Sequence, residues 1–156
     1  MTGLPTDVHP VPRRAPAPPA ALDLLTQAER GLEEAAALAD PGDAYVAAHL
    51  AALRTAAAVL AVRGRPEPTS RGRRRIRSVW EVLPEIAPDL AEWGVLFAAS
   101  AGRRARIEAG IRGVVAQGDA DELRRAAAFF LRLVEEMLLR RPMLRPRDEP
   151  GGPAAE

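Results

Sequence analysis

The sequence predicts an all-α protein: an antiparallel bundle of four long helices plus a short Pro-containing helix. Alanine and leucine supply 32 and 18 of the 156 residues, and both are strong helix formers. Aromatic residues make up only 4% of the chain, whereas β-strands favour aromatic and β-branched side chains. Apolar residues recur along four segments at the spacing of one helical face, and short connections separate these segments.

The composition excludes several classes of protein. The chain has no cysteine, which excludes disulfides, thiolate metal sites and a cysteine nucleophile. Its net charge of +1 is too small to indicate a nucleic-acid-binding protein by itself. The longest apolar run, from Ala56 to Val62, is far shorter than the roughly 20 residues that span a bilayer. We therefore expect a soluble, cytoplasmic protein with no membrane segment.

Proline-rich segments flank the predicted helices. Residues 1–19 contain six prolines and show no helical periodicity, so they are expected to form a disordered tail. Residues 142–156 have the same character and predict a second disordered tail. The helical domain is therefore expected to span residues 20–141.

The first two helices are predicted at residues 20–39 and 43–62, separated by the helix-breaking sequence Asp40-Pro41-Gly42. The apolar face of the first consists of Leu25, Ala28, Leu32, Ala36 and Ala39. The apolar face of the second consists of Val46, Leu50, Leu53, Ala57 and Leu60. A loop at residues 64–77 follows, with two prolines and a glycine between its ends.

The second half of the domain begins with a short helix at Ser78. Ser78 and Glu81 have the spacing of a capping box, and the prolines that follow keep this helix short. A long helix is expected at residues 89–109, and the last helix at residues 119–141, with Asp119 as its capping residue. The inward face of the last helix consists of Leu123, Ala127, Phe130, Val134 and Met137.

His49 is the only histidine within the predicted helices, and it lies about 60° from the middle of its helix's apolar face. One interpretation is a half-buried, hydrogen-bonded residue at the edge of the core. The other is a general acid–base or a group that contacts RNA, because an imidazole exchanges protons near neutral pH. The sequence leaves both open.

A cluster of positive charge lies in the loop before Ser78. Five arginines fall within seven residues, and the rest of the chain then carries −4 (from +1 minus 5). Guanidinium groups bind phosphates in pairs of hydrogen bonds, so the cluster predicts a phosphate-binding loop; the alternative is a loop that is merely solvated. The arginines are Arg71, Arg73, Arg74, Arg75 and Arg77.

The sequence contains no motif for a metal site or for a catalytic nucleophile. The sequence has no H-E-x-x-H or E-x-x-H motif, and no serine lies in a G-x-S-x-G context, so we expect no metal and no cofactor. The arginines at residues 103–106 are explained by the dipole at a helix C-terminus. Arg104 projects onto the same face as Trp93 and Phe97.

A family resemblance rests on the second helix and on the order of the elements. The stretch YVAAHLAALRTAAAVLAVRGRP, from Tyr45 to Pro66, resembles the second helix of HEPN domains, and SVWEVLPEIAPDL resembles the short segment that follows it. The resemblance covers about residues 20–141 and is closest to a small stand-alone branch of high-G+C bacteria. It implies a helical bundle that forms a homodimer. Many HEPN domains are metal-independent ribonucleases with an Arg-x(4–6)-His motif, and others bind nucleotides or partner nucleotidyltransferases.

The sequence departs from the ribonuclease motif. No arginine lies four to six residues before His49, and the reversed pair with Arg54 points about 140° apart on a helix. The favoured function is therefore a HEPN-like binding or interaction module for RNA or a nucleotide, without the usual catalytic motif. The arginine-rich loop would bind phosphate, and His49 would line a groove with Tyr45, Arg54, Trp80 and Arg104.

Two alternatives remain. The first is a divergent metal-independent ribonuclease, in which His49 acts as the acid–base and Arg104 or an arginine of the 71–77 loop stabilises the reacting phosphate. The second is a purely structural adaptor that docks another protein through apolar helix faces, which predicts a large exposed apolar patch.

Overall fold

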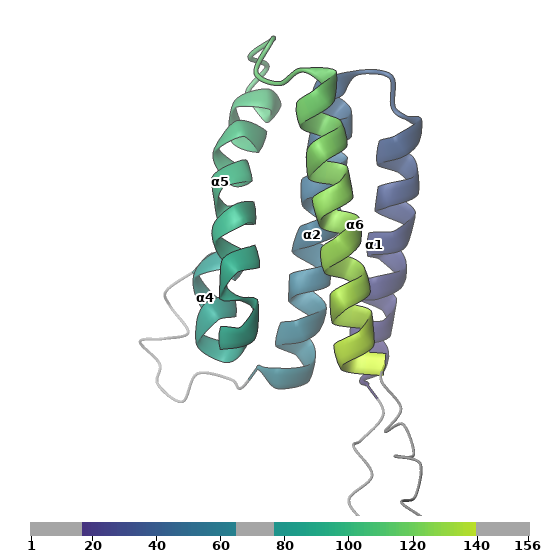
Figure 1. Cartoon of the computed structure of the whole chain (residues 1–156), viewed down its shortest axis with the longest axis vertical. Helices are drawn as coiled ribbons and strands as arrows, with labels where there is room; N and C mark the ends of the chain where they lie inside the picture. Colours follow the sequence, from purple (N-terminus) through teal and green to yellow (C-terminus); the bar gives the residue numbers. More distant parts are fainter. Residues whose placement is uncertain (1–16, 65–76, 140–156) are drawn as a thin grey trace, which may run out of the picture.

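The computed structural model describes residues 17–64 and 77–139, and these residues form helices and no strands. Long helices alternate in direction, so the prediction of an antiparallel all-α bundle is confirmed (Figure 1). The predicted tails lie almost entirely outside the described residues. The elements are α1 (Pro19–Ala37), α2 (Pro41–Arg63), α4 (Val79–Ile86), the 3-10 turn η1 (Pro88–Leu90), α5 (Ala91–Glu108) and α6 (Gln117–Leu139).

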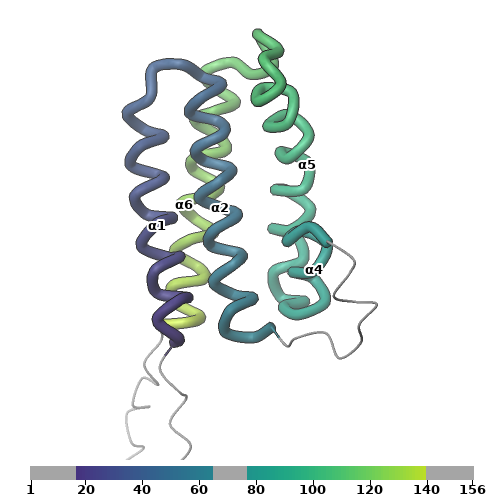
Figure 2. The backbone as a smooth tube through the Cα atoms, turned by 180° about the vertical axis from the view of Figure 1, so that it is seen from behind, coloured from purple at the N-terminus to yellow at the C-terminus, as the bar shows by residue number. Residues whose placement is uncertain are grey.

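Helix α2 is the central element of the bundle. It packs against α1, α6, α5 and α4, and Figures 1 and 2 show it between α1 and α5 from opposite sides. By length and hydropathy α2 would pass as a membrane span, but half of that window is buried inside the bundle. Its apolar character is therefore explained by its place in the core. Small buried side chains bring its neighbours close: Ala44, Ala48, Ala51, Ala52, Ala56 and Ala58.

Helix α2 begins two residues before the predicted start. Asp40 is its N-cap, and its carboxylate accepts the backbone N–H of Asp43 at 3.0 Å. Pro41 occupies the first helical position, where the missing N–H costs nothing and the fixed φ suits a helix. The predicted helix-breaking sequence therefore ends α1 and also starts α2.

The short helix α4 begins as predicted. The Ser78 hydroxyl accepts the backbone N–H of Glu81 at 3.3 Å, and Pro84 lies inside the helix. The next helix starts later than predicted because Pro88 to Leu90 form a 3-10 turn, so α5 begins at Ala91.

Asp119 does not cap the last helix, and this prediction is wrong. Helix α6 begins at Gln117, so Asp119 lies in its first turn. There its Oδ2 accepts the backbone N–H of Ala116 at 2.9 Å. The carboxylate thus satisfies a free donor from inside the helix, as the acidic half of a capping box does.

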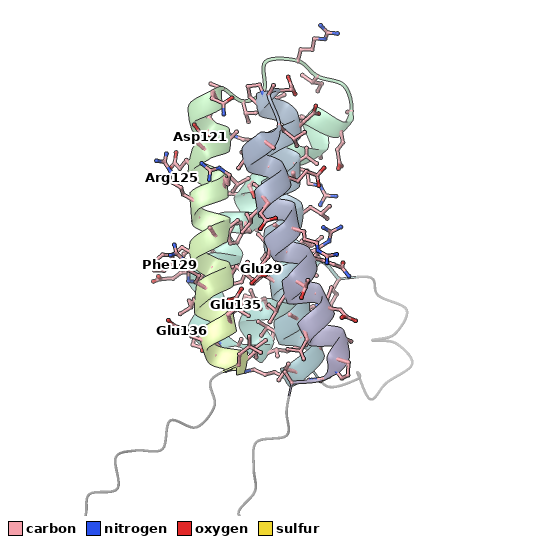
Figure 3. All side chains as sticks on the ribbon, turned by 90° about the vertical axis from the view of Figure 1, so that its right-hand side faces the viewer. Glu29, Asp121, Arg125, Phe129, Glu135 and Glu136 are labelled. Carbon is pink, nitrogen blue, oxygen red and sulfur yellow. The ribbon has the colours of Figure 1, made fainter. Side chains whose placement is uncertain are left out.

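Two glutamates meet at the seam between α1 and α6. Figure 3 shows Glu29 of α1 beside Glu135 of α6, and the two carboxyl groups share a hydrogen bond. The pKa of Glu135 is raised to about 7 by burial first and then by the hydrogen bond and negative charge of Glu29, whereas Arg132 opposes the shift. The seam therefore holds a proton over part of the pH range in which an isolated glutamate is fully ionised.

Candidate functional site: a slot between α5 and α6

His49 is buried in the core, with an exposed fraction of only 1%. Its Nδ1 lies 2.6 Å from Oγ of Ser100, and the Ser100 hydroxyl donates to the Phe97 carbonyl at 2.9 Å. A serine hydroxyl has one hydrogen, and because it is in reach of the Phe97 carbonyl, we assign His49 as the donor in its bond to Ser100. This assigns the tautomer with the proton on Nδ1.

The ring of His49 is enclosed by aromatic side chains. It packs edge-on against Trp80, with the ring centroids 5.8 Å apart, and Trp80 lies 5.2 Å from Phe97. Trp80 itself is 6% exposed, so it belongs to the core cluster. Edge-to-face contacts of this kind stabilise the packing beyond the area that they bury.

The surroundings of His49 favour its neutral form. Its pKa is lowered from 6.5 to about 4, chiefly by burial and also by the positive charge of Arg104, while Glu108 opposes the shift. The sequence suggested a half-buried residue at the core edge. It is fully buried because α5 covers it with Ser100, a contact between residues 51 positions apart.

A cavity of about 370 Å³ lies on the outer side of this hydrogen bond, and we call it the α5–α6 slot. Helix α5 forms one wall and α6 the other, and the buried side chain of Tyr45 from α2 reaches it from the core. Ser100 belongs to both places, because its hydroxyl bonds His49 and its side chain lines the slot. The lining residues are Tyr45, Leu96, Ala99, Ser100, Arg103, Asp119, Glu122, Leu123 and Ala126.

Three charged side chains line the slot: the cation Arg103 and the anions Asp119 and Glu122. Arg103 Nη1 lies 3.7 Å from Asp119 Oδ1, a loose ion pair between half-exposed side chains. Glu122 is exposed and makes no hydrogen bond or ion pair with the described residues. Burial raises the pKa of Tyr45 above its usual value, and the Arg103 guanidinium opposes this shift. At neutral pH the slot therefore presents a neutral phenol and a net charge of −1.

The other predicted site residues lie apart from the slot. Arg104 pairs with Glu108 at 3.1 Å, and Arg77 pairs with Glu85. Arg54 lines a separate cavity of about 430 Å³ formed by α1, α2 and the end of α5, with no lining residue in common with the slot. Arg71, Arg73, Arg74 and Arg75 lie outside the described residues.

Sequence reasoning did not identify four polar residues of the slot. Ser100 and Arg103 are three residues apart on α5, and Asp119 and Glu122 are three apart on α6, so each pair shares a helix face. That spacing is the one signal in the sequence. It does not reveal that the two faces oppose each other, because this depends on how α5 and α6 pack around α2.

Apolar side chains are exposed along the same two helices. Phe129 of α6 is 56% exposed, and Leu96 of α5 is exposed and also lines the slot. Trp93 stacks on Phe129 with the ring centroids 5.5 Å apart, so an aromatic cluster runs from the core to the surface. We call this set the apolar patch: Trp93, Leu96 and Phe129. Figure 3 shows Phe129 pointing outward from α6.

Comparison with known proteins identifies the family. Residues 35–135 match the family described as SAV_6107-like HEPN, and the match contains α2, α4, α5 and nearly all of α6. No curated protein matches the chain significantly, and neither does any solved structure. The matched region contains every residue that lines the α5–α6 slot. The chain therefore belongs to the SAV_6107-like HEPN family.

Proposed function

We propose that this HEPN domain is a binding module without ribonuclease activity, and that its ligand is RNA or a nucleotide. The observation that carries the proposal is the burial of His49, the one histidine among the described residues. The domain extends over residues 20–141, and the match at residues 35–135 lies within these limits.

The ribonuclease alternative requires His49 to exchange protons with RNA. A general base must come within hydrogen-bond reach of the hydroxyl that it activates, and His49 is 1% exposed. Its Nδ1 is already bonded to Ser100, and a pKa of about 4 leaves no imidazolium at neutral pH to act as the acid. Arg104, the proposed partner of His49, is paired with Glu108. These facts favour a structural role for His49.

Binding rests on two features. The α5–α6 slot supplies a cavity with convergent polar groups, which is the usual form of a small-ligand site. The arginine-rich segment Arg71–Arg77 supplies positive charge next to α4, and we propose that it binds phosphates of the same ligand. We place the protein in the cytoplasm on this account, where RNA and nucleotides are available.

A second candidate function is that of a protein–protein adaptor. The apolar patch favours it, since Leu96 and Phe129 leave large apolar side chains in water. We propose a second copy of the chain as the first partner, because the HEPN fold commonly dimerises. An adaptor of this kind would be indifferent to the arginine-rich segment.

The test is cleavage and retention of a mixed-sequence RNA pool in the presence of EDTA. The wild-type chain is compared with His49→Gln, which replaces the imidazole with an amide that does not titrate. We expect no cleavage by either protein and retention of uncut RNA by both. Cleavage by the wild type that His49→Gln abolishes would contradict the proposal and establish the ribonuclease alternative.

A variant of the arginine-rich segment separates RNA binding from the adaptor function. Replacing Arg73, Arg74 and Arg75 by alanine removes three positive charges, so RNA binding should weaken and its salt dependence should flatten. Replacing Arg124 and Arg125 on α6 removes two charges elsewhere and serves as the control. A wild-type chain that does not bind RNA at low salt would leave the adaptor function in its place.

A further inference from the structure

We propose that the α5–α6 slot binds a guanine base. This inference rests on the proposed function and names the part of an RNA or nucleotide that the slot recognises.

The slot has an apolar end and a polar end. On α5, Leu96 and Ala99 precede Arg103 by one to two turns; on α6, Leu123 and Ala126 follow Asp119 by a similar distance. The two helices are antiparallel (Figure 1), so Arg103 and Asp119 lie at one level of the slot, whereas Glu122 directly precedes Leu123 and lies level with the apolar residues. The Arg103–Asp119 ion pair joins the walls at the polar level. A flat ring therefore fits between apolar walls with one edge toward the charged groups.

The polar groups of the slot include more free acceptors than free donors. Oδ2 of Asp119 accepts a hydrogen bond from the Ala116 N–H, but Oδ1 makes only the loose ion pair with Arg103. Both oxygens of Glu122 are unused among the described residues. The Tyr45 hydroxyl is already hydrogen-bonded to Arg103 and Ser100, so the donors that remain are the other N–H groups of the Arg103 guanidinium. A complementary ligand brings two adjacent N–H donors with an acceptor beside them.

Guanine is the base that has this arrangement. Its N1–H and N2–H₂ form a donor pair for a carboxylate, and its O6 and N7 accept from an arginine. We assign Glu122 to the donor pair and Arg103 to O6 and N7. Adenine and cytosine would turn a ring-nitrogen lone pair toward Glu122, and uracil offers one ring N–H between two carbonyls. Guanine alone satisfies the carboxylate with two hydrogen bonds.

The charge of the slot places the phosphate outside it. The slot contains one positive charge, from Arg103, and two negative charges, from Asp119 and Glu122. A phosphate inside the slot would therefore be repelled by a net negative lining. A neutral base meets no such penalty. The phosphates of the ligand would then lie outside the slot, in solvent.

The test is calorimetric titration of the full chain with GMP, IMP and AMP. IMP lacks the N2 amino group, so its affinity should lie between those of the other two. Glu122→Gln replaces a carboxylate oxygen with an N–H₂ that faces the guanine donors, and GMP binding should weaken at least about tenfold. Glu136→Gln is the matched control, because Glu136 is an exposed glutamate of α6 that does not line the slot (Figure 3).

The inference is overturned by equal affinities for GMP and AMP, by an unchanged GMP affinity in Glu122→Gln, or by no binding at about 1 mM GMP. Retention of uridine-only RNA as strongly as the mixed pool, unaffected by Glu122→Gln, would remove the guanine pocket and leave RNA binding in place. If the wild-type chain retained no RNA at all, the proposed RNA binding would be contradicted. The GMP titration would still test the slot independently.

Discussion

The Nδ1 of His49 donates a 2.6 Å hydrogen bond to the Oγ of Ser100, and this bond joins α2 to α5 in the interior of the bundle. Ser100 passes its own hydrogen to the Phe97 carbonyl within α5. Serines inside helices commonly bond a carbonyl of the preceding turn, which leaves the oxygen lone pairs available. The imidazole thus serves as a buried donor that fixes the position of α5 on α2.

Ser100→Ala should destabilise the protein. The substitution leaves the His49 N–H buried without an acceptor, which costs about 1–3 kcal/mol in the free energy of unfolding. Thr26→Ala is the matched control, because Thr26 makes the same kind of bond to the Leu22 carbonyl at 3.1 Å on an exposed face. It should change stability by less than about 0.5 kcal/mol. Chemical denaturation of both variants checks the difference, and equal effects would contradict a structural role for Ser100.

His49 should make the protein less stable in acid. The unfolded chain protonates His49 below its ordinary pKa of 6.5, whereas the folded chain does so only near pH 4. The stabilisation is therefore complete above pH 6.5 and is lost as the pH falls toward 4. Between pH 7 and pH 5 the loss should be about 2 kcal/mol. Denaturation of the wild type and of His49→Gln at both pH values isolates the loss of stability due to His49. Parallel pH profiles of the two proteins would contradict the burial of His49.

Glu135 should make the protein less stable at alkaline pH, the opposite of the effect of His49. The pKa of Glu135 is raised from 4.5 to about 7. Its contribution to the free energy of unfolding is therefore complete below pH 4.5 and is lost as the pH rises through 7. At pH 8 both Glu29 and Glu135 are charged and repel each other. Glu135→Gln should therefore stabilise the protein at pH 8, by less than about 1 kcal/mol for these largely exposed groups, and have little effect at pH 5. Thermal melts of this variant and of Glu136→Gln, its exposed neighbour, test the expectation; identical pH responses would refute it.

Two glycines at and near the end of α5 should respond oppositely to alanine. A Cβ at Gly102 would meet no atom within 4 Å, so Gly102→Ala should stabilise the helix by about 0.5–1 kcal/mol. Gly110 has φ of +85°, and the Ile111 N–H after it donates to the Arg106 carbonyl at 3.1 Å, which forms a Schellman cap. Gly110→Ala should cost about 1 kcal/mol. Melting temperatures that shift in the same direction would contradict this description of the α5 terminus.

The sequence predicts the helices well because local signals determine them. Ser78 and Glu81 mark the start of α4 through a contact three residues apart, and the structure shows that contact. The errors are also local: the sequence predicts Pro41 within a helix-breaking stretch, but it starts α2, and it predicts Asp119 as a cap, but Asp119 lies in the first turn of α6. Each error displaces a boundary by only a few residues.

The site depends on packing that no local signal encodes. The sequence singles out His49 and Tyr45, but it does not show that Ser100 covers the first or that Arg103 approaches the second. Both contacts arise because α5 packs against α2. The 140° separation of His49 and Arg54 on α2 is a local property, and the structure places them in different environments.

The measurement that tests the central claim most directly is a pH titration of the His49 ring nitrogens by NMR. The variant His9→Gln leaves His49 as the only imidazole in the chain. We expect a single neutral tautomer with the proton on Nδ1, slow exchange of that proton with water, and no titration between pH 8 and pH 5.5. An imidazole that titrates near its ordinary pKa of 6.5 and exchanges rapidly with water would contradict the claim, because such a group is available for acid–base catalysis.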